Sequence, residues 1–342
     1  MIAGLAVGDA LGSPWEFTRS AAPSNAGTNL QPFIWGPYHG HGPYVSALGQ
    51  VTDDTEMTLV LARSLARNGG WRRNDVIQSY INWINSKTII DGKKYGMRMV
   101  GRNTKFLFKG ITQVKSFEVR WCKNTLAPLD QWTQSNGAMM RCSPLVVLNT
   151  RSFDIINDVS LTNPHPNCVG TNALYLSVLR HVISSSNVQS SRSVFRSAIL
   201  RGLYEVEDMI TDEVAEIVRN IVKGNHRSLN GRNKGWCLNG LDAAFRAAWF
   251  AVQNDSNIGI YQKLIQYTIQ RGGDTDTTGA ITGALIGAFD GYDRLRQDPW
   301  FRECWNTVRQ SDSNEGQLPR PIEYSLQDFD SVTSGLAYLY SV

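Results

Sequence analysis

Two short acidic segments, far apart in the sequence, contain the side chains most able to do chemistry. Residues 52–56 read TDDTE and residues 272–278 read GGDTDTT, and each precedes an expected helix. Aspartate and threonine are preferred at helix N-termini, so either segment alone is most simply interpreted as a cap. A cap needs one side-chain oxygen, however, whereas together the segments offer four aspartate carboxylates and several threonine hydroxyls.

If the two helix starts meet in the fold, the four carboxylates repel one another and raise each other's pKa. A bound divalent cation removes that repulsion, and a ligand set made only of oxygens suits Mg²⁺, Mn²⁺ or Ca²⁺ better than zinc. The number of ligands indicates two metals bridged by a shared aspartate. The glycine pair at residues 272–273 would allow the backbone to approach closely.

Three further segments carry weaker signals. Residues 8–17 (GDALGSPWEF) place Glu16 beyond a Gly-Ser-Pro break that could direct it into a cleft. Residues 135–141 (SNGAMMR) form a turn signal before an apolar run, and residues 162–166 (TNPHP) enclose a histidine between prolines. Each segment also has a structural interpretation: a surface glutamate, a tight turn and a structural histidine.

Helical periodicity dominates the chain and predicts a mostly or wholly α fold. Residues 52–67, 212–222 and 240–253 each place apolar residues at the spacing of an amphipathic helix. Clean two-residue alternation over six or more residues is hard to find. Loops are expected over 18–50 and 224–235, and no segment marks a domain boundary, which favours a single domain over residues 1–342.

Glycines recur every four residues in two other expected helices. Each helical glycine costs about 1 kcal/mol relative to alanine, so a sequence that keeps six of them uses the missing side chains for close backbone contact. We therefore expect these two helices to pack tightly at the centre of an α-bundle. The glycines are Gly4, Gly8, Gly12, Gly279, Gly283 and Gly287.

Composition excludes several classes of protein. The 342 residues are 42% hydrophobic and 19% charged, which is typical of a globular protein and not of a disordered one. No apolar run approaches the roughly 18 residues of a membrane helix. The first residues lack a basic segment and contain Asp9, so a cytoplasmic protein without a signal peptide is expected. Five cysteines without close pairs argue against a zinc cluster or a disulfide framework.

Charge is distributed unevenly. The net charge is +4, but residues 72–123 contain 12 basic residues against three acidic ones. Such a stretch is usually a solvated face, and a polyanionic partner is the alternative.

The five segments together resemble the ADP-ribosylglycohydrolases. The resemblance spans roughly residues 2–291 and rests on GDALG with Glu16, TDDTEM, SNGAMMR, TNPHP and GGDTDTTGAITGALIGA. It implies a single compact all-α bundle of many helices and a dimetal hydrolase that removes ADP-ribose from modified proteins, as the dinitrogen-reductase-activating type does. Residues 292–342 match no motif and are expected to be an extension of unknown role.

The resemblance also assigns roles to individual residues. Glu16 matches an acid that acts near the scissile bond, and we expect it to take part in the chemistry and not in metal binding. Many members have histidine where this chain has Asn163, which can still donate a hydrogen bond. The implied ligands of two Mg²⁺ or Mn²⁺ ions are Thr52, Asp53, Asp54, Asp274, Asp276 and Thr277. The implied substrate-binding residues are Gly101, Ser135, Asn136, Gly137, Asn163 and Trp236.

The expected partner is an ADP-ribosylated protein or a small-molecule conjugate of ADP-ribose, cleaved at the anomeric carbon of the ribose. Two alternatives remain open. The chain could be a silent ADP-ribose-binding relative, comparable to lens crystallins, or a hydrolase that acts on modified nucleic acid through the basic stretch. The sequence does not determine the acceptor, the choice between Mg²⁺ and Mn²⁺, or the oligomeric state.

Overall fold

The computed structural model describes residues 1–17, 49–86, 88–90, 93–95, 100–125, 134–148, 153–185, 191–225, 227–229, 233–250, 259–312 and 320–341. Most of the predicted loop over 18–50 lies outside these residues. The described part is built almost entirely from helices, so the predicted all-α class is confirmed. One short antiparallel hairpin, β1 (Thr88–Ile90) and β2 (Lys93–Tyr95), is the exception among the described residues.

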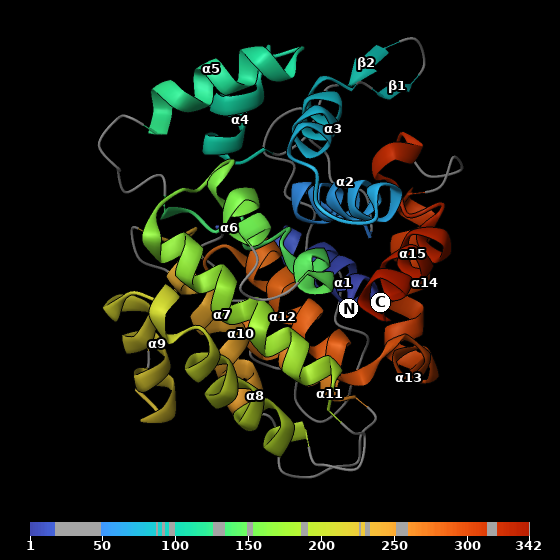
Figure 1. Ribbon diagram of the computed structural model, residues 1–342. Helices are drawn as coiled ribbons and strands as arrows, with labels where there is room; N and C mark the ends of the chain where they lie inside the picture. The colour runs from blue at the N-terminus through green and yellow to red at the C-terminus, as the bar shows by residue number, and fades with distance from the viewer. Residues whose placement is uncertain are drawn as a thin grey trace.

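Two helices, α1 (Ile2–Gly12) and α12 (Thr275–Asp290), lie side by side at the centre of the molecule (Figure 1). Every residue of α1 is buried. A Cβ atom added at Gly4, Gly8 or Gly12 would lie closer than 3.0 Å to a backbone oxygen of α12. The same holds in reverse for Gly279 and Gly283. The predicted central packing of the glycine-rich helices is therefore confirmed, and only residues without side chains allow it.

The remaining helices surround this pair. In chain order they are α2 (Asp53–Asn68), α3 (Arg73–Asn85), α4 (Arg102–Phe108), α5 (Val114–Thr125), α6 (Phe153–Ser160), α7 (Pro166–Ile183), α8 (Ser191–Glu205), α9 (Asp212–Val222), α10 (Cys237–Trp249), α11 (Ile260–Gln270), α13 (Tyr292–Gln297), α14 (Pro299–Asp312) and α15 (Phe329–Ser341). Helices α7 to α10 cover one side of the centre, and α13 to α15 cover the other (Figure 1). Within the described residues, no helix combines the length and apolarity that crossing a bilayer requires.

The amphipathic segments form the helices that their periodicity predicts. Helix α9 matches its predicted range of 212–222, and α2 begins at Asp53 with Thr52 as its N-cap. Helix α10 differs from the predicted range of 240–253, because it begins three residues earlier, at Cys237, and ends at Trp249. All five cysteines are free thiols.

Candidate metal centre and substrate cleft

A cleft of about 580 Å³ opens beside the N-termini of α2 and α12. Segments far apart in the sequence line it, including both acidic segments and the turn that begins at residue 135. Most of the predicted site residues line it: Glu16, Asp53, Asp54, Gly101, Ser135, Asn136, Gly137, Trp236, Asp274, Asp276 and Thr277. The fold thus brings the separate motifs together at one site.

Asp9 of α1 holds the first turn of α2. Its fully buried carboxylate accepts hydrogen bonds from the backbone N–H of Thr52 (3.0 Å) and of Thr55 (3.1 Å). The Thr55 hydroxyl donates to the same carboxylate (2.6 Å), and Thr52 Oγ1 lies 2.8 Å from Asp9 and 2.9 Å from Asp54. Burial raises the pKa of Asp9 to about 6, although these hydrogen bonds lower it. The sequence analysis did not assign Asp9 to the site, although the GDALG motif contains it.

The two aspartates of α2 face the cleft with different partners. Asp53 Oδ2 accepts a hydrogen bond from the backbone N–H of Gly101 (3.2 Å), which ties the start of α4 to the acidic cluster. Asp54 is 1% exposed, and its Oδ1 atom has no hydrogen-bond partner among the described residues. A buried carboxylate oxygen without a partner costs free energy unless a ligand satisfies it.

The start of α12 supplies the second half of the cluster. Asp274 is the N-cap residue of α12, and its Oδ2 atom accepts a hydrogen bond from Asn136 Nδ2 (2.8 Å). Carboxylate oxygens of Glu16, Asp274 and Asp276 all lie within 4.8 Å of one another. Glu16, which the sequence analysis set apart from the metal ligands, thus lies close enough to share a cation with them.

A strained backbone conformation fixes Glu16 in this position. The 3₁₀ turn Ser13–Trp15 ends α1, and Phe17 then adopts a positive φ of 52°, which is unusual for a residue with a side chain. The backbone N–H of Phe17 donates to the carbonyl oxygen of Gly273 (2.9 Å), so the chain is attached to the start of α12 directly after Glu16. The break predicted at Gly-Ser-Pro therefore directs Glu16 towards α12.

Electrostatics make the acidic cluster unfavourable without a counter-charge. Burial, reinforced by the carboxylate of Asp274, raises the pKa of Glu16 to about 9. Burial raises the pKa of Asp53 to about 8, and it raises the pKa of Asp54 and Asp276 well above the ordinary value, with neighbouring carboxylates adding to the effect. All the atoms that could bind a metal here are oxygens. Among the described residues, Asp54 Oδ1 has no hydrogen-bond partner, and the carboxylates of Glu16, Asp274 and Asp276 lie close together. These residues therefore fit a hard divalent cation such as Mg²⁺ or Mn²⁺.

The predicted substrate loop is joined to the start of α10. Ser135 and Trp236 form an isolated antiparallel bridge, and the backbone N–H of Asn136 donates to the carbonyl oxygen of Gly235 (2.8 Å). A Cβ atom at Gly235 would lie 3.0 Å from Asp274 Oδ2, so this loop packs directly on the acidic cluster. The bridge explains why residues 135–137 and Trp236 line one cleft.

A buried arginine supports the same loop. Arg141, which is 0% exposed, donates to the carbonyl oxygen of Gly137 (2.7 Å) and to the hydroxyl of Thr162 (2.9 Å). Its guanidinium also forms an ion pair with the buried Asp158 (3.6 Å). Sequence reasoning did not single out Arg141. A charged residue between the buried Met140 and Cys142 was the available signal.

Two predicted site residues do not line the cleft. Asn163 is 1% exposed, and its side-chain amide donates to the hydroxyl of Ser135 (2.9 Å) while its oxygen accepts from the hydroxyl of Thr162 (2.7 Å). The structure thus places Asn163 behind Ser135, where it supports the loop and is not exposed to a substrate. Thr52 is 7% exposed, and its hydroxyl lies between Asp9 and Asp54.

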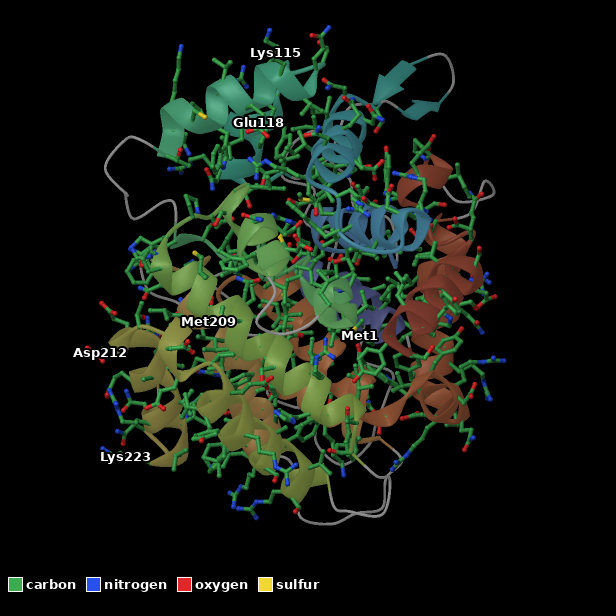
Figure 2. All side chains as sticks on the ribbon, in the orientation of Figure 1. Met1, Lys115, Glu118, Met209, Asp212 and Lys223 are labelled. Carbon is green, nitrogen blue, oxygen red and sulfur yellow. The ribbon has the colours of Figure 1, made fainter. Side chains whose placement is uncertain are left out.

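Part of the basic stretch of the sequence lies on and next to α4 and α5. Arg102, Lys105, Lys109, Lys115 and Lys123 are exposed there, and Figure 2 shows Lys115 at the edge of the molecule. Glu118 of α5 is paired with Arg73 of α3 (2.8 Å) and so does not oppose this charge. Arg102 also lines the cleft, so one of these exposed basic residues lies at the cleft itself.

Comparison with known proteins identifies relatives over most of the chain. The family model described as ADP-ribosylglycohydrolase matches residues 1–315, beyond the 2–291 that the motifs span. The ADP-ribosyl-[dinitrogen reductase] glycohydrolase of Rhodospirillum rubrum is 24% identical over 85% of this chain and 85% of its own length. The ADP-ribosylarginine hydrolase Tri1 of Serratia proteamaculans is 23% identical over 88% of this chain and 73% of its own length.

A solved structure has the same fold. An ADP-ribosylglycohydrolase-related protein complex matches with a TM-score of 0.56 and 22% identity. The match covers 90% of this chain and 93% of the other.

Proposed function

Because the chain belongs to the ADP-ribosylglycohydrolase family and is thus a hydrolase of glycosyl bonds, we propose that it removes ADP-ribose from an acceptor with the help of two divalent cations. The bond cleaved is the one between the anomeric carbon of the ribose and the acceptor. The observation that carries this proposal is the acidic cluster at the two helix starts. Within it, the buried Asp54 Oδ1 has no hydrogen-bond partner among the described residues.

We assign the cations to Asp53, Asp54, Asp274, Asp276 and Thr277, with Thr52 holding Asp54 in place. When bound, Mg²⁺ or Mn²⁺ would supply positive charge that holds the ribose hydroxyls in position beside the bond to be cleaved. Asp9 contributes by fixing the first turn of α2, because it occupies the backbone N–H groups of Thr52 and Thr55.

Glu16 is the residue we assign to proton transfer. Its pKa of about 9 keeps the carboxyl protonated at neutral pH in the metal-free cleft, and nearby cations would lower that value. A carboxyl group whose pKa lies near the working pH can both give a proton to a leaving group and take one from water. The hydrogen bond from Phe17 to Gly273 holds it at the mouth of the cluster.

The remaining cleft residues would bind the rest of ADP-ribose. A Cβ atom at Gly101 would meet no protein atom within 4 Å, so space remains there for a ligand to approach the backbone. Asn136 and Gly137 present a turn held from behind by Arg141, which suits a phosphate-bearing ligand. Trp236, joined to Ser135 by the β-bridge, offers an aromatic face for the base.

The test is release of ADP-ribose from a panel of defined conjugates in the presence of Mg²⁺ or Mn²⁺, measured by chromatography. ADP-ribosylarginine comes first in the panel because a relative is named for it. Release from at least one conjugate, abolished by EDTA, is the expected result. Tight ADP-ribose binding with no release from any conjugate would identify a silent binding protein instead.

A second candidate concerns the acceptor. The exposed basic residues on and next to α4 and α5 include Arg102, which lines the cleft, and this favours an acceptor linked to a polyanion such as a nucleic acid. Turnover of an ADP-ribosylated oligonucleotide should then fall steeply as salt increases, whereas turnover of a small conjugate should not. Equal salt dependence for both substrates would contradict this candidate.

A further inference from the structure

Residues 320–341, the described part of the chain after α14, lie outside the family match, which ends at residue 315, but they pack against the helix that carries the TDD motif. Helix α15 lies beside α2 (Figure 1), and residues 322–324 form a 3₁₀ turn that also contacts α2. The sequence analysis left the role of residues 292–342 open.

Arg320 is the most deeply buried charged residue among residues 320–341. Its side chain is only 2% exposed, and its three donor nitrogens have three different partners. Nε donates to Glu56 Oε1 (2.6 Å), Nη1 donates to Asp312 Oδ1 (3.1 Å), and Nη2 donates to the carbonyl oxygen of Val51 (2.6 Å). Val51 precedes Thr52 and Glu56 follows Thr55, so the guanidinium spans both ends of the acidic segment of α2.

Further contacts hold Glu56 and the segment before α2 in place beside Arg320. The second oxygen of Glu56 accepts from the indole N–H of Trp83 (2.9 Å), so both oxygens of this carboxylate are engaged away from the cleft. Just before Val51, Gly49 has a φ of +75°, and a Cβ atom there would lie 2.7 Å from the carbonyl oxygen of Thr307. Residues 49–56 are thus fixed between α14 and Arg320.

We propose that Arg320 is a positioning residue for the metal centre, and that the C-terminal segment is part of the catalytic scaffold. By holding the Val51 carbonyl and the Glu56 carboxylate together, it sets the orientation in which the first turn of α2 presents Asp53 and Asp54. This inference rests on the proposed function, because it assumes that these aspartates bind the cations. It also agrees with the single domain expected from the sequence.

A purely structural salt bridge is the competing explanation, and the chain offers a matched control. Arg63 lies in α2, two turns after Glu56, and binds the same C-terminal segment. Its guanidinium donates to the carbonyl oxygens of Glu323 (2.9 Å) and Ser325 (2.6 Å) and forms an ion pair with Asp328. It makes none of the Arg320 contacts with Val51, Glu56 or Asp312. If Arg320 only fastens the segment, losing either arginine should have the same consequences.

The experiment compares Arg320→Gln with Arg63→Gln in the full-length protein by Mn²⁺ titration, followed by electron paramagnetic resonance and calorimetry. Both variants should melt at lower temperature than the wild type. Only Arg320→Gln should bind Mn²⁺ more weakly, by about 10–100-fold, the usual effect of losing a residue that orients metal ligands. Arg320→Lys serves as a second variant that keeps the buried positive charge. A single ammonium cannot reproduce the three-way contact, so its Mn²⁺ affinity should fall about 10-fold.

The outcomes separate the inference from the proposed function. Unchanged Mn²⁺ affinity in folded Arg320→Gln or Arg320→Lys, or an equal loss in Arg63→Gln, overturns the positioning role and leaves the proposed function intact. A wild-type protein that binds no Mn²⁺ overturns both. A selective loss in the Arg320 variants supports the inference.

Discussion

The two helix starts that form the acidic cluster are held in place by different means. The start of α2 is fixed by side chains, through Asp9 and Thr52 on one side and Arg320 on the other. The start of α12 is fixed mainly by close backbone contact, because Gly12 of α1 packs against Thr275 and Gly8 against Gly279, with a side-chain hydrogen bond from Asn136 to Asp274 in addition. The difference teaches that the α12 half of the site cannot be separated from the core, whereas the α2 half depends on a few polar contacts.

The strongest test replaces one ligand from each half. Asp54→Asn and Asp276→Asn should each lower turnover by at least about 10⁴-fold, since bound cations supply several kcal/mol of transition-state stabilisation. Neither change should unfold the protein, because burial already disfavours the charged form of both carboxyl groups. Turnover and metal-free melting temperature are measured on the same samples. Full activity in excess EDTA, or a fully active Asp276→Asn protein, would contradict the dimetal assignment.

A substitution of Glu16 tests whether this carboxyl group transfers a proton or binds a metal ion. Glu16→Gln should lower turnover by about 10²–10⁴-fold and leave the affinities for ADP-ribose and Mn²⁺ nearly unchanged, because only the proton carrier is lost. Calorimetry and a turnover assay on one preparation decide the matter, with Glu213→Gln on the exposed face of α9 as control. A joint collapse of Mn²⁺ and ADP-ribose binding would make Glu16 a metal ligand, as its distance to Asp274 and Asp276 allows.

The close backbone contact between α1 and α12 predicts that a larger side chain there will destabilise the protein. Gly283→Leu should destabilise the protein by about 3 kcal/mol or more, because the new side chain meets the carbonyl of Gly4 and cannot move away from it. Urea unfolding measures the change. Gly101→Ala is the control, since its φ of −50° is ordinary and the added methyl group meets no protein atom. An unchanged melting temperature in Gly283→Leu would argue against the central packing.

At the start of α2, which side chains hold in place, we expect a substitution to cost less stability than Gly283→Leu but to weaken metal binding. Asp9→Ala removes the acceptor for Thr52 and Thr55 and should cost about 2 kcal/mol, comparable to the loss of a strong helix cap. It should also weaken Mn²⁺ binding by about 10-fold. Thr211→Ala, at the N-cap of α9 and outside the cleft, should cost stability without changing metal affinity. Equal Mn²⁺ affinity in all three proteins would disprove the role of Asp9.

The smallest expected effect is the pH dependence of the metal-free protein. Glu16 and Asp53 have folded-state pKa values of about 9 and about 8, above the ordinary values of 4.5 and 3.8. The folded chain therefore holds protons that the unfolded chain has released, so stability falls as pH rises through this window. The melting temperature in EDTA should drop by about 2 °C or more between pH 5 and pH 8. Added Mn²⁺ should flatten or reverse this slope, and an identical slope with and without metal would argue against binding at the cluster.

Much of the fold could be predicted from sequence because its signals are local. The spacing of apolar residues gave α9 its bounds, and the helix expected over 52–67 agrees with α2 to within one residue at each end. Glycine spacing predicted the central pair, because only glycine permits the backbone contact seen between α1 and α12. Most motif residues that the resemblance assigned to the site do line one cleft.

What the sequence could not determine are the contacts between segments far apart in the chain. Asp9 acts through hydrogen bonds to Thr52 and Thr55, far along the chain, and Arg141 joins the nearby Gly137 to Asp158 and Thr162. Asn163 illustrates the converse, because its motif points to substrate while its side chain is buried against Ser135.

The sequence by itself determined which residue types are available: two acidic segments whose carboxylates would favour a cation if they met, and two helices whose glycines allow close contact. Only the tertiary structure decided which oxygens meet, that Glu16 lies within 4.8 Å of Asp274 and Asp276, and that Arg320 fixes the segment before α2. The physical reason is that residue type sets charge and conformational preference locally, whereas distances between segments follow from the packing of all the helices together.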